Sequence, residues 1–525
     1  MAAVSLRGMD VRAKGAAEDF ARPRGDIGTV LDLVDRDSQD NTYFPLDAEG
    51  SWFHEEERKT HPTTVSIQEF PQRGPAQWGG RFSFELGSLA TAGDLLQSVM
   101  LQITLRHWYN PRVLYQLYRG ELTTYPTGSL EEEEYWTFCN SLGTCIVEYA
   151  DFIVNEQTVE RITGEWIRVW LTLNAERGTA VGIATDAVGA VPVASLSGGG
   201  AGTAFDARRP YPVENGVYFC VLPFFFLRTR LSETFPLLSC NEGSVRIDVK
   251  LRDFSDMVRR VVGYRRTCGD VPLGKVVSLA TTTVPSVEVA SETAVVAPEF
   301  RDFRIITTCV LLGSGLRQKF LRLPFEQMVK MVQVFSFEEP MKYVVTKGNA
   351  LAGDVVEVQL PLELNHPVVE LVWVLRRKGV RVNNEWANFT PSLERESGWG
   401  RVASAWLERG VLRVNGQEVV SAEGDWFREH IAGVHQGGFT AYQAGVYGYS
   451  FSRVPESHQP SGSANMSRAG SVTLGLRVRT PMALPLPAGS VFDAAVVEGW
   501  EVFVFAVHWQ WLRFQNGLCE RDFVD

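Results

Sequence analysis

The sequence contains an internal repeat, and this repeat constrains the fold more than any other feature. Residues 155–167 align with residues 415–427, sharing Asn, Gln, Val, Gly, an acidic residue and Trp at identical spacing. Three further blocks match in the same order: 99–105 with 369–375, 216–218 with 445–447, and 243–245 with 470–472. The offset between matching blocks falls along the chain. A tandem duplication whose second copy has shorter loops explains this ordered set.

The residue pattern within the repeat is that of β-strands. Alternating apolar and polar residues, as expected of half-buried strands, occupy 82–86, 99–105, 245–251, 356–360 and 472–478. Two other segments, 218–227 and 502–511, are apolar and rich in aromatic residues, which is typical of strands buried inside a sandwich. The sequence therefore predicts an all-β fold of two tandem jelly-roll β-sandwiches, a double jelly roll, with long inserted loops and few short helices.

The repeat divides the 525 residues into four parts. Each copy spans roughly 200 residues, a usual size for one β domain. Two copies of about eight strands favour jelly rolls over a propeller, which needs at least four blades. We predict an N-terminal arm and lead-in over 1–60, a first jelly roll over 61–255, an inter-domain linker over 256–300 and a second jelly roll over 301–525.

The charge and the cysteines argue against several classes of protein. The chain carries 51 Lys and Arg against 62 Asp and Glu, a net charge of −11, so we expect no direct binding of nucleic acid. Its seven cysteines are widely spaced and form no C-x-x-C pair, which disfavours a zinc or redox site and fits reduced thiols. The first 24 residues lack the apolar region of a secretory signal, and no apolar run is long enough to span a membrane.

We find no residue pattern that indicates catalysis, a cofactor or a metal. The sequence lacks a phosphate-binding loop, an H-E-x-x-H motif and a G-x-S-x-G motif, and its eight histidines do not fall at metal-ligand spacing. Glu165 and Asp425 are the nearest candidates for the carboxylate pair of a glycoside hydrolase. They precede Trp166 and Trp426 at equivalent places in the two copies. We therefore expect the acids to lie in different domains and both tryptophans to be core aromatics.

Two N-x-S/T sequons occur, at Asn388 and Asn465. Such sequons accept sugar in the surface loops of secreted proteins. Because the sequence shows no secretory signal, we expect neither asparagine to be glycosylated.

Long motifs in the second half, and a shorter one in the first, resemble those of a known family. Residues 459–468 (QPSGSANMSR) are similar to a hallmark Q-P-S-G-x-x-N-F-S-R stretch, with Met466 in place of the usual Phe. Residues 364–374 resemble an L-N-H-P-x-x-E-L-x-W-x strand, and residues 222–226 an L-P-F-W-F stretch. The principal motif positions are Gln459, Pro460, Ser461, Gly462, Asn465, Ser467, Arg468, Asn365, His366, Pro367 and Trp373. The family is that of the major capsid proteins of nucleocytoplasmic large DNA viruses.

This resemblance implies a structural shell protein rather than an enzyme. Family members are double jelly rolls that form homotrimers, whose six similar sandwiches make a pseudo-hexagonal capsomer that tiles an icosahedral shell with its neighbours. The resemblance also implies contacts with minor capsid and penton proteins, an internal membrane approached only indirectly, and assembly into the virion in the host cytoplasm, a virus factory or the nucleus. The alternative is a two-domain β-sandwich protein that binds or cleaves carbohydrate through convergent acids and aromatic residues.

Overall fold

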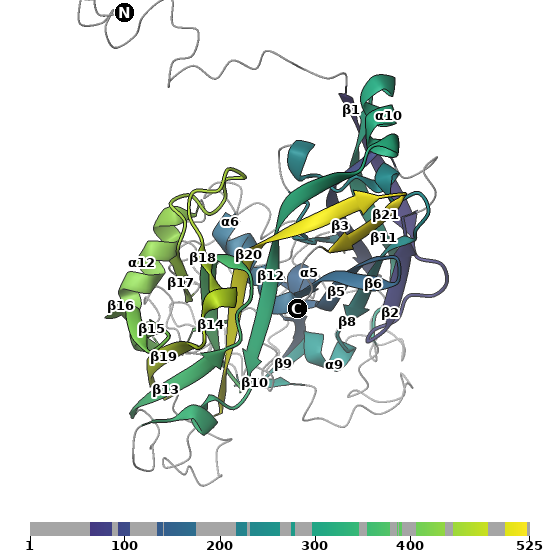
Figure 1. Cartoon of the computed structure of the whole chain (residues 1–525). Coiled ribbons are helices and arrows are strands. Elements are labelled where there is room, and N and C mark those ends of the chain that lie inside the picture. The colour runs from purple at the N-terminus through teal and green to yellow at the C-terminus, as the bar shows by residue number, and fades with distance from the viewer. Residues whose placement is uncertain are drawn as a thin grey trace, which may run out of the picture. The chain divides into compact units, whose positions relative to one another are not determined.

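The computed structural model describes most of the chain from residue 63 onward (Figure 1). The described residues are 63–86, 93–105, 134–139, 141–174, 217–227, 231–262, 275–278, 297–345, 354–378, 386, 388–390, 406–435, 445–480 and 499–521. They belong to one compact unit, Thr63–Asp525, and Met1–Pro62 forms a separate unit. The predicted N-terminal arm, and most of the predicted linker, lie outside the described residues.

The first sandwich consists of two four-stranded antiparallel sheets. One sheet has the order β1 (Thr63–Pro71), β11 (Phe300–Leu312), β3 (Leu95–Leu105) and β7 (Val217–Val221). The other has the order β2 (Arg81–Glu85), β8 (Val245–Leu251), β5 (Val147–Val154) and β6 (Gln157–Thr163). A separate three-stranded sheet has the order β10 (Lys275–Ser278), β9 (Val258–Val262) and β4 (Glu134–Phe138).

The second sandwich also consists of two antiparallel sheets. The larger has the order β12 (Phe325–Phe337), β20 (Trp500–Gln515), β14 (Pro367–Arg377) and β17 (Val446–Ser450), with β18 (Ala464–Asn465) on β14 and β21 (Leu518–Arg521) on β20. The other has the order β13 (Val355–Leu362), β19 (Val472–Arg479), β15 (Leu407–Val414) and β16 (Gln417–Glu423).

The two sandwiches have the same topology. The order β1-β11-β3-β7 corresponds strand by strand to β12-β20-β14-β17, and β2-β8-β5-β6 corresponds to β13-β19-β15-β16. All four repeated sequence blocks fall on corresponding elements: β3 and β14, β6 and β16 with the helices that follow, β7 and β17, and β8 and β19. The tandem duplication and the double jelly-roll fold predicted from the sequence are therefore confirmed.

The strongest repeat block builds the same turn in both sandwiches. Asn155 and Asn415 both have a φ of 52° at the turns β5–β6 and β15–β16, a left-handed conformation that Asn adopts more readily than most residues. The backbone N–H of Asn155 donates to Ser244 O at 2.9 Å, and that of Asn415 donates to Ser471 O at 2.8 Å. These contacts join the Asn block to the Gly-Ser-Val block in each copy, which gives a physical reason for the two blocks to recur together.

The helix after each of these hairpins begins at a glycine. A Cβ on Gly164, the first residue of α6 (Gly164–Asn174), would lie 2.3 Å from Val147 O. A Cβ on Gly424, the first residue of α12 (Gly424–Val434), would lie 1.9 Å from Leu407 O. Because only glycine permits this approach, both helices pack closely against the first residue of the neighbouring strand.

The other described helices are short. They are α5 (Leu142–Cys145), α9 (Phe254–Met257), α10 (Ser314–Arg322) and the 3-10 turns η3 (Leu231–Glu233), η4 (Leu237–Ser239), η6 (Pro340–Tyr343) and η7 (Met466–Arg468). Within the described ranges, no helix combines the length and the apolar character needed to cross a membrane.

The boundary between the sandwiches differs from the sequence prediction. Strand β11 pairs with β3 and β1, so it completes the first sandwich although it begins at Phe300. The second sandwich therefore begins at β12, at Phe325, rather than at residue 301. The linker predicted over 256–300 contains β9 and β10. The alternating pattern of β11 predicts a strand but carries no information about the sheet it joins, which explains the error.

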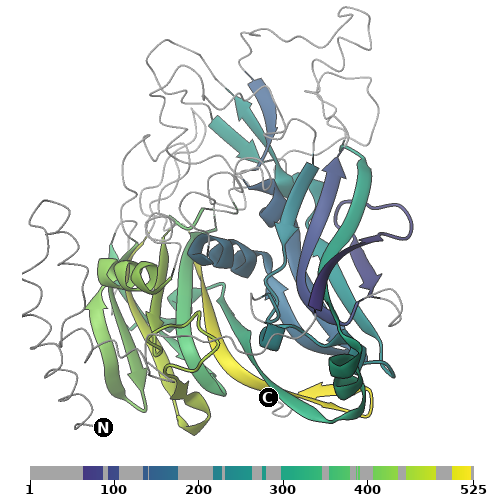
Figure 2. The same cartoon turned by 90° about the horizontal axis from the view of Figure 1, so that it is seen from above.

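The sheet β12-β20-β14-β17 is buried on both faces. Trp373 and Val504 belong to the core of the second sandwich, whereas Val372 and Phe505 pack in a cluster with residues of the first sandwich. All four side chains are at most 1% exposed. Burial on both faces explains why residues 502–511 are apolar almost throughout. Figure 2 shows α6 (blue) between the sheets of the two sandwiches.

Candidate functional site: the motif loop and the interface between the sandwiches

The two motif segments of the second sandwich lie side by side. Asn465 of β18 pairs with Pro367 at the start of β14. The N–H of Met466 donates to His366 O at 3.0 Å, and the N–H of His366 donates to Ser467 Oγ at 2.8 Å. The Asn-Met-Ser part of one motif therefore satisfies backbone groups of the Asn-His-Pro part of the other.

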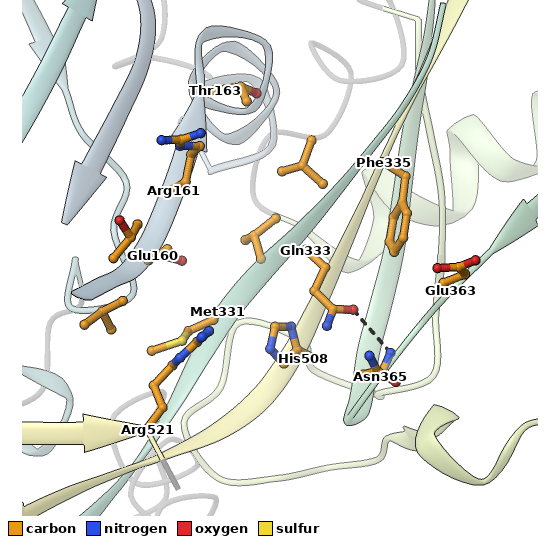
Figure 3. Close-up of a pocket in the computed structure, with 14 residues that line it drawn as sticks. Glu160, Arg161, Thr163, Met331, Gln333, Phe335, Glu363, Asn365, His508 and Arg521 are labelled. Atoms are coloured by element: carbon orange, nitrogen blue, oxygen red, sulfur yellow. Dashed lines mark hydrogen bonds between the residues drawn. The ribbon is translucent and has the colours of Figure 1, made fainter. Parts of the chain in front are cut away.

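Further contacts fix the Asn-His-Pro corner. His366 has a φ of 65°, and its ring stacks on His508 of β20 with centroids 5.0 Å apart. The N–H of Asn365 donates to Gln333 Oε1 at 3.4 Å (Figure 3). Met466 is buried in the core of the second sandwich, so the methionine that replaces the usual Phe still fills an apolar position.

The Ser-Gly pair of the hallmark motif closes the loop that follows β17. Ser461 Oγ lies 2.6 Å from Ser452 Oγ and accepts the N–H of Val454 at 3.0 Å. Gly462 has a φ of 147°, and a Cβ at this position would lie 2.5 Å from Phe451 O. The identity of both residues is therefore explained by contacts within the chain.

The remaining motif residues divide between the core and the surface. Trp373 lies in the core, edge-on to Phe427 at 5.1 Å and stacked on Tyr447 at 6.4 Å between ring centroids. Gln459, Pro460 and Arg468 are exposed, as are Asn365, Gly462, Asn465 and Ser467 of the contacts described above.

We expect Gly462→Ala to destabilise the chain by roughly 1–3 kcal/mol, because it adds a steric clash to a strained positive φ. Gly433→Ala is the matched control, since a Cβ there meets no atom within 4 Å and lies inside helix α12. That control should be neutral or stabilising by up to about 1 kcal/mol. Urea unfolding of both variants measures the difference, and equal stabilities would contradict the assignment of Gly462 to a conformational role.

A buried ion cluster joins the two sandwiches. Glu165 of α6 accepts hydrogen bonds from Arg252 at 3.0 Å and from Arg376 of β14 at 2.8 Å. Arg376 also donates from Nε to Glu501 of β20 at 2.5 Å. The side chains of Arg376 and Glu501 are 1% and 0% exposed. Two residues of each sandwich thus form one charge network at the interface.

The carboxylates and guanidinium groups of this cluster can be buried because each charge lies beside an opposite one. Burial of Glu165 favours its neutral form, but Arg376 and Arg252 overcome this effect and hold the pKa of the carboxyl at about 2. The indole of Trp386 covers both guanidinium groups, at 4.1 Å from Arg252 and 5.2 Å from Arg376. No spacing in the sequence links these residues, so the cluster was not predictable from the sequence.

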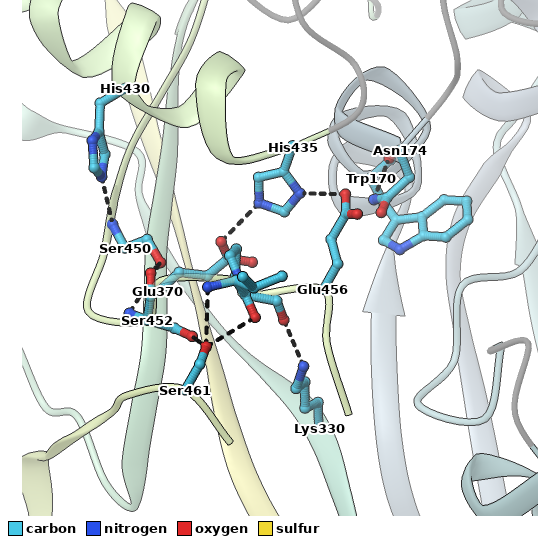
Figure 4. A network of polar contacts seen from close by, with 12 residues as sticks. Trp170, Asn174, Lys330, Glu370, His430, His435, Ser450, Ser452, Glu456 and Ser461 are labelled. Atoms are coloured by element: carbon cyan, nitrogen blue, oxygen red, sulfur yellow. Dashed lines mark hydrogen bonds and ion pairs between the residues drawn. The ribbon is translucent and has the colours of Figure 1, made fainter. Parts of the chain in front are cut away.

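A second buried network lies where α12 ends (Figure 4). The His435 ring lies between two carboxylates, with Nε2 2.8 Å from Glu370 Oε2 and Nδ1 3.1 Å from Glu456 Oε1. Lys330 of β12 donates to Pro455 O at 2.5 Å, so β12 anchors the same loop. Burial lowers the pKa of His435, but the carboxylates of Glu370 and Glu456 dominate and raise it to about 10.

We expect the free energy of unfolding to fall as the pH rises from about 6.5 to 10, because the imidazolium of His435 is stabilised only in the folded chain. Its contribution is complete below pH 6.5. The loss by pH 9 should be roughly 2–4 kcal/mol, since each unit between the two pKa values is worth about 1.4 kcal/mol. Urea unfolding of wild type and His435→Gln across this range measures it. A wild-type slope that matches the variant's would rule out this role for His435.

A pocket of about 490 Å³ lies between β6 and β12 (Figure 3). Two of its charged side chains, those of Glu160 and Arg161, make structural contacts. Glu160 Oε2 accepts the N–H of Phe225 at 2.8 Å, and Arg161 donates two hydrogen bonds to Asp151, at 2.6 and 2.8 Å. In the described part of the chain, no group of three or more His, Cys, Asp or Glu could hold a metal ion.

The structure separates the two repeat-equivalent tryptophans. Trp166 is 4% exposed and packs on Phe505 of β20 with ring centroids 5.1 Å apart, as expected of a core aromatic. Trp426 is 41% exposed, so its assignment to the core is wrong. Both residues hold the same helical position, but only Trp166 packs on the other sandwich, whereas Trp426 contacts His430 and Tyr449 of its own sandwich. Asp425 pairs with Arg428 at 3.2 Å, apart from the ion cluster that holds Glu165.

The sequon at Asn388 forms a local turn. Asn388 Oδ1 accepts hydrogen bonds from Thr390 N at 3.0 Å and from Thr390 Oγ1 at 2.7 Å, and the residue is half-buried. Nothing in this geometry tests glycosylation, so its absence stays a prediction.

Comparisons with known proteins point to one family. Residues 317–519 match the family described as large eukaryotic DNA virus major capsid protein, and residues 51–291 match the family described as major capsid protein N-terminus. The chain is 23% identical over 327 residues to capsid protein 1 of Acanthamoeba polyphaga mimivirus, covering 61% of this chain and 44% of that protein. It is 26% identical over 190 residues to the major capsid protein of Paramecium bursaria Chlorella virus 1, covering 33% of this chain and 40% of that protein.

The fold agrees with these matches. The chain spans less than half the length of the curated relatives it matches. A solved structure described as a quasi-atomic model of the PBCV-1 virus capsid aligns with a TM-score of 0.58 at 15% identity, covering 90% of this chain and all of that one. With both sequence matches falling on successive sandwiches of a double jelly roll, the chain belongs to the family of large eukaryotic DNA virus major capsid proteins.

Proposed function

We propose that this chain is the major capsid protein of a large double-stranded DNA virus, and that three copies form a pseudo-hexagonal capsomer that tiles an icosahedral shell. The observation that carries this proposal is the identical strand order of the two sandwiches. Three copies of a two-sandwich chain present six comparable sandwiches around one axis. Contacts between subunits close the ring, and contacts between rings remain open to extend a shell.

The interface between the sandwiches supports this function mechanically. A shared apolar cluster and the buried ion cluster hold the sandwiches in one compact unit. A tile must keep its shape because its edges have to match those of its neighbours. The buried charged side chains at the interface pair with one another. This agrees with a family of structural proteins rather than enzymes.

The same proposal extends to partners and location. The virion shell is the expected location, with neighbouring capsomers as the main contacts and minor capsid and penton proteins as further ones. The net charge of −11 supports a shell that does not bind nucleic acid directly.

Light scattering on the purified full chain tests the proposal. A trimer has three times the chain mass of 58.5 kDa, about 175 kDa. Electron microscopy of the same fraction should show hexagonal particles. A folded chain that remains a monomer at high concentration would contradict the proposal.

A further inference from the structure

The exposed face of α12 has a buried counterpart in the same chain. In α6, Trp166 is 4% exposed because the helix packs against the neighbouring sandwich. At the equivalent position of α12, Trp426 is 41% exposed and stacks only on side chains of its own sandwich, with ring centroids 4.8 Å from His430 and 6.4 Å from Tyr449. The exposed indole continues into the partly exposed rings of His430 and Tyr449, and contiguous aromatic patches are found at interaction sites.

The surface that Trp166 contacts also has a counterpart in the first sandwich. Trp166 packs on Phe505, which pairs with Val372 of β14. On the corresponding strands, Arg304 of β11 pairs with Gln102 of β3. Residues 102 and 372 occupy the same place in the repeat, because block 99–105 matches block 369–375. Arg304 therefore occupies on the first sandwich the position that Phe505 occupies on the second.

The surroundings of Arg304 suit a contact with an aromatic ring. Its guanidinium pairs with both Glu69 and Asp302, which fixes the orientation of the planar group, and its side chain remains 30% exposed. On the neighbouring edge strand β1, Ile67 is 69% exposed. A fixed and partly exposed guanidinium can receive an indole ring by stacking. Ile67 pairs with Thr308, farther along β11, and adds apolar surface to the same sheet.

We propose that the α12 face of one copy docks on the β1-β11-β3-β7 sheet of the next copy, with Trp426 against Arg304. This inference rests on the proposed trimer and names the surfaces that close it. We choose a second copy as the partner because the equivalent helix and the equivalent sheet already meet within each chain. There, α6 of the first sandwich packs on the sheet β12-β20-β14-β17 of the second. Figure 1 shows α12 and β1 far apart on the described part of the chain, so one copy can use both surfaces at once in head-to-tail contacts.

The repeat also explains the difference between the two contacts. Within the chain the contact is apolar and permanently buried, with Trp166 on Phe505. Between copies the equivalent pair is Trp426 and Arg304, which leaves the separate subunit soluble before it assembles. An aromatic residue and an arginine at the centre of a contact are typical of interface hot spots.

Trp426→Ala tests the proposal, with Trp511→Ala as the matched control because Trp511 is 37% exposed but lies on neither surface. We expect Trp426→Ala to raise the concentration at which the trimer dissociates by about thirtyfold or more, as for a hot-spot residue. The control should dissociate like wild type in analytical ultracentrifugation. Trp426→Ala trimers as tight as wild type would overturn the proposal, whereas a monomeric wild type would overturn the proposed function instead.

A crosslinking experiment keeps the proposal testable if Trp426→Ala affects folding. Copies with Trp426→Cys are co-expressed with copies with Arg304→Cys and treated with a short bismaleimide. We expect covalent dimers from this mixture and none from Trp511→Cys with Arg304→Cys. The six described native cysteines are buried, which limits background reaction. Equal crosslinking of both mixtures would overturn the assignment of these two surfaces.

Discussion

Arg376→Ala is expected to lower the free energy of unfolding by about 3–5 kcal/mol, one of the two largest effects we expect from a single substitution. The guanidinium is 1% exposed and holds Glu165 of the first sandwich and Glu501 of the second. Its removal would leave two buried carboxylates without their shared partner. The charge penalty of such a pair exceeds the value of the lost hydrogen bonds. Urea unfolding at neutral pH measures the change.

Two further variants separate burial from charge pairing. Arg479→Ala removes an ion pair with Glu408 of similar length, 2.8 Å, but Arg479 is 62% exposed, so we expect a loss below about 1 kcal/mol. The double variant Arg376→Met with Glu501→Leu removes opposite charges together and should be less damaging than Arg376→Ala alone. If Arg479→Ala and Arg376→Ala have equal effects, the ion cluster does not hold the sandwiches together.

The same cluster gives the acid limit of stability. The pKa of Glu165 is depressed to about 2 in the folded chain, so its contribution is complete above the ordinary pKa near 4.5 and is lost as the pH falls toward 2. His435 sets an opposite limit at alkaline pH. Both groups contribute fully only between about pH 4.5 and 6.5.

The fold was largely predictable because the repeat carries long-range information. Asn155 and Asn415 mark the same turn, and Gly164 and Gly424 the same close approach of helix to strand. Each residue has a backbone reason to recur, so the matching blocks identified corresponding elements without any knowledge of tertiary contacts. Alternation of apolar and polar residues does not determine which strands pair. The strand order could therefore be predicted only through the fold class.

The contacts between the sandwiches were not predictable by the same means. β11 reads as an ordinary strand, and its membership of the first sandwich depends on pairing with β1, more than 200 residues earlier in the chain. Trp386 has no neighbouring motif, yet it covers both Arg252 and Arg376. Tertiary packing determines such partners. A single sequence gives no information about that packing where the residues form no repeat or periodic pattern.

Trp166→Ala is expected to lower the free energy of unfolding by about 3–5 kcal/mol, because a buried tryptophan leaves a large cavity between α6 and β20. The matched variant is Trp426→Ala, at the equivalent position of α12, where 41% of the residue is exposed. Its cost in the separate subunit should stay near 1 kcal/mol or below. The repeat makes the two substitutions chemically identical, so the difference measures what the neighbouring sandwich contributes. Urea unfolding at low protein concentration, where subunits are separate, provides the comparison. Equal losses would mean that burial against β20 does not stabilise α6, and that Trp426 owes its identity to the fold of its own sandwich rather than to a second copy.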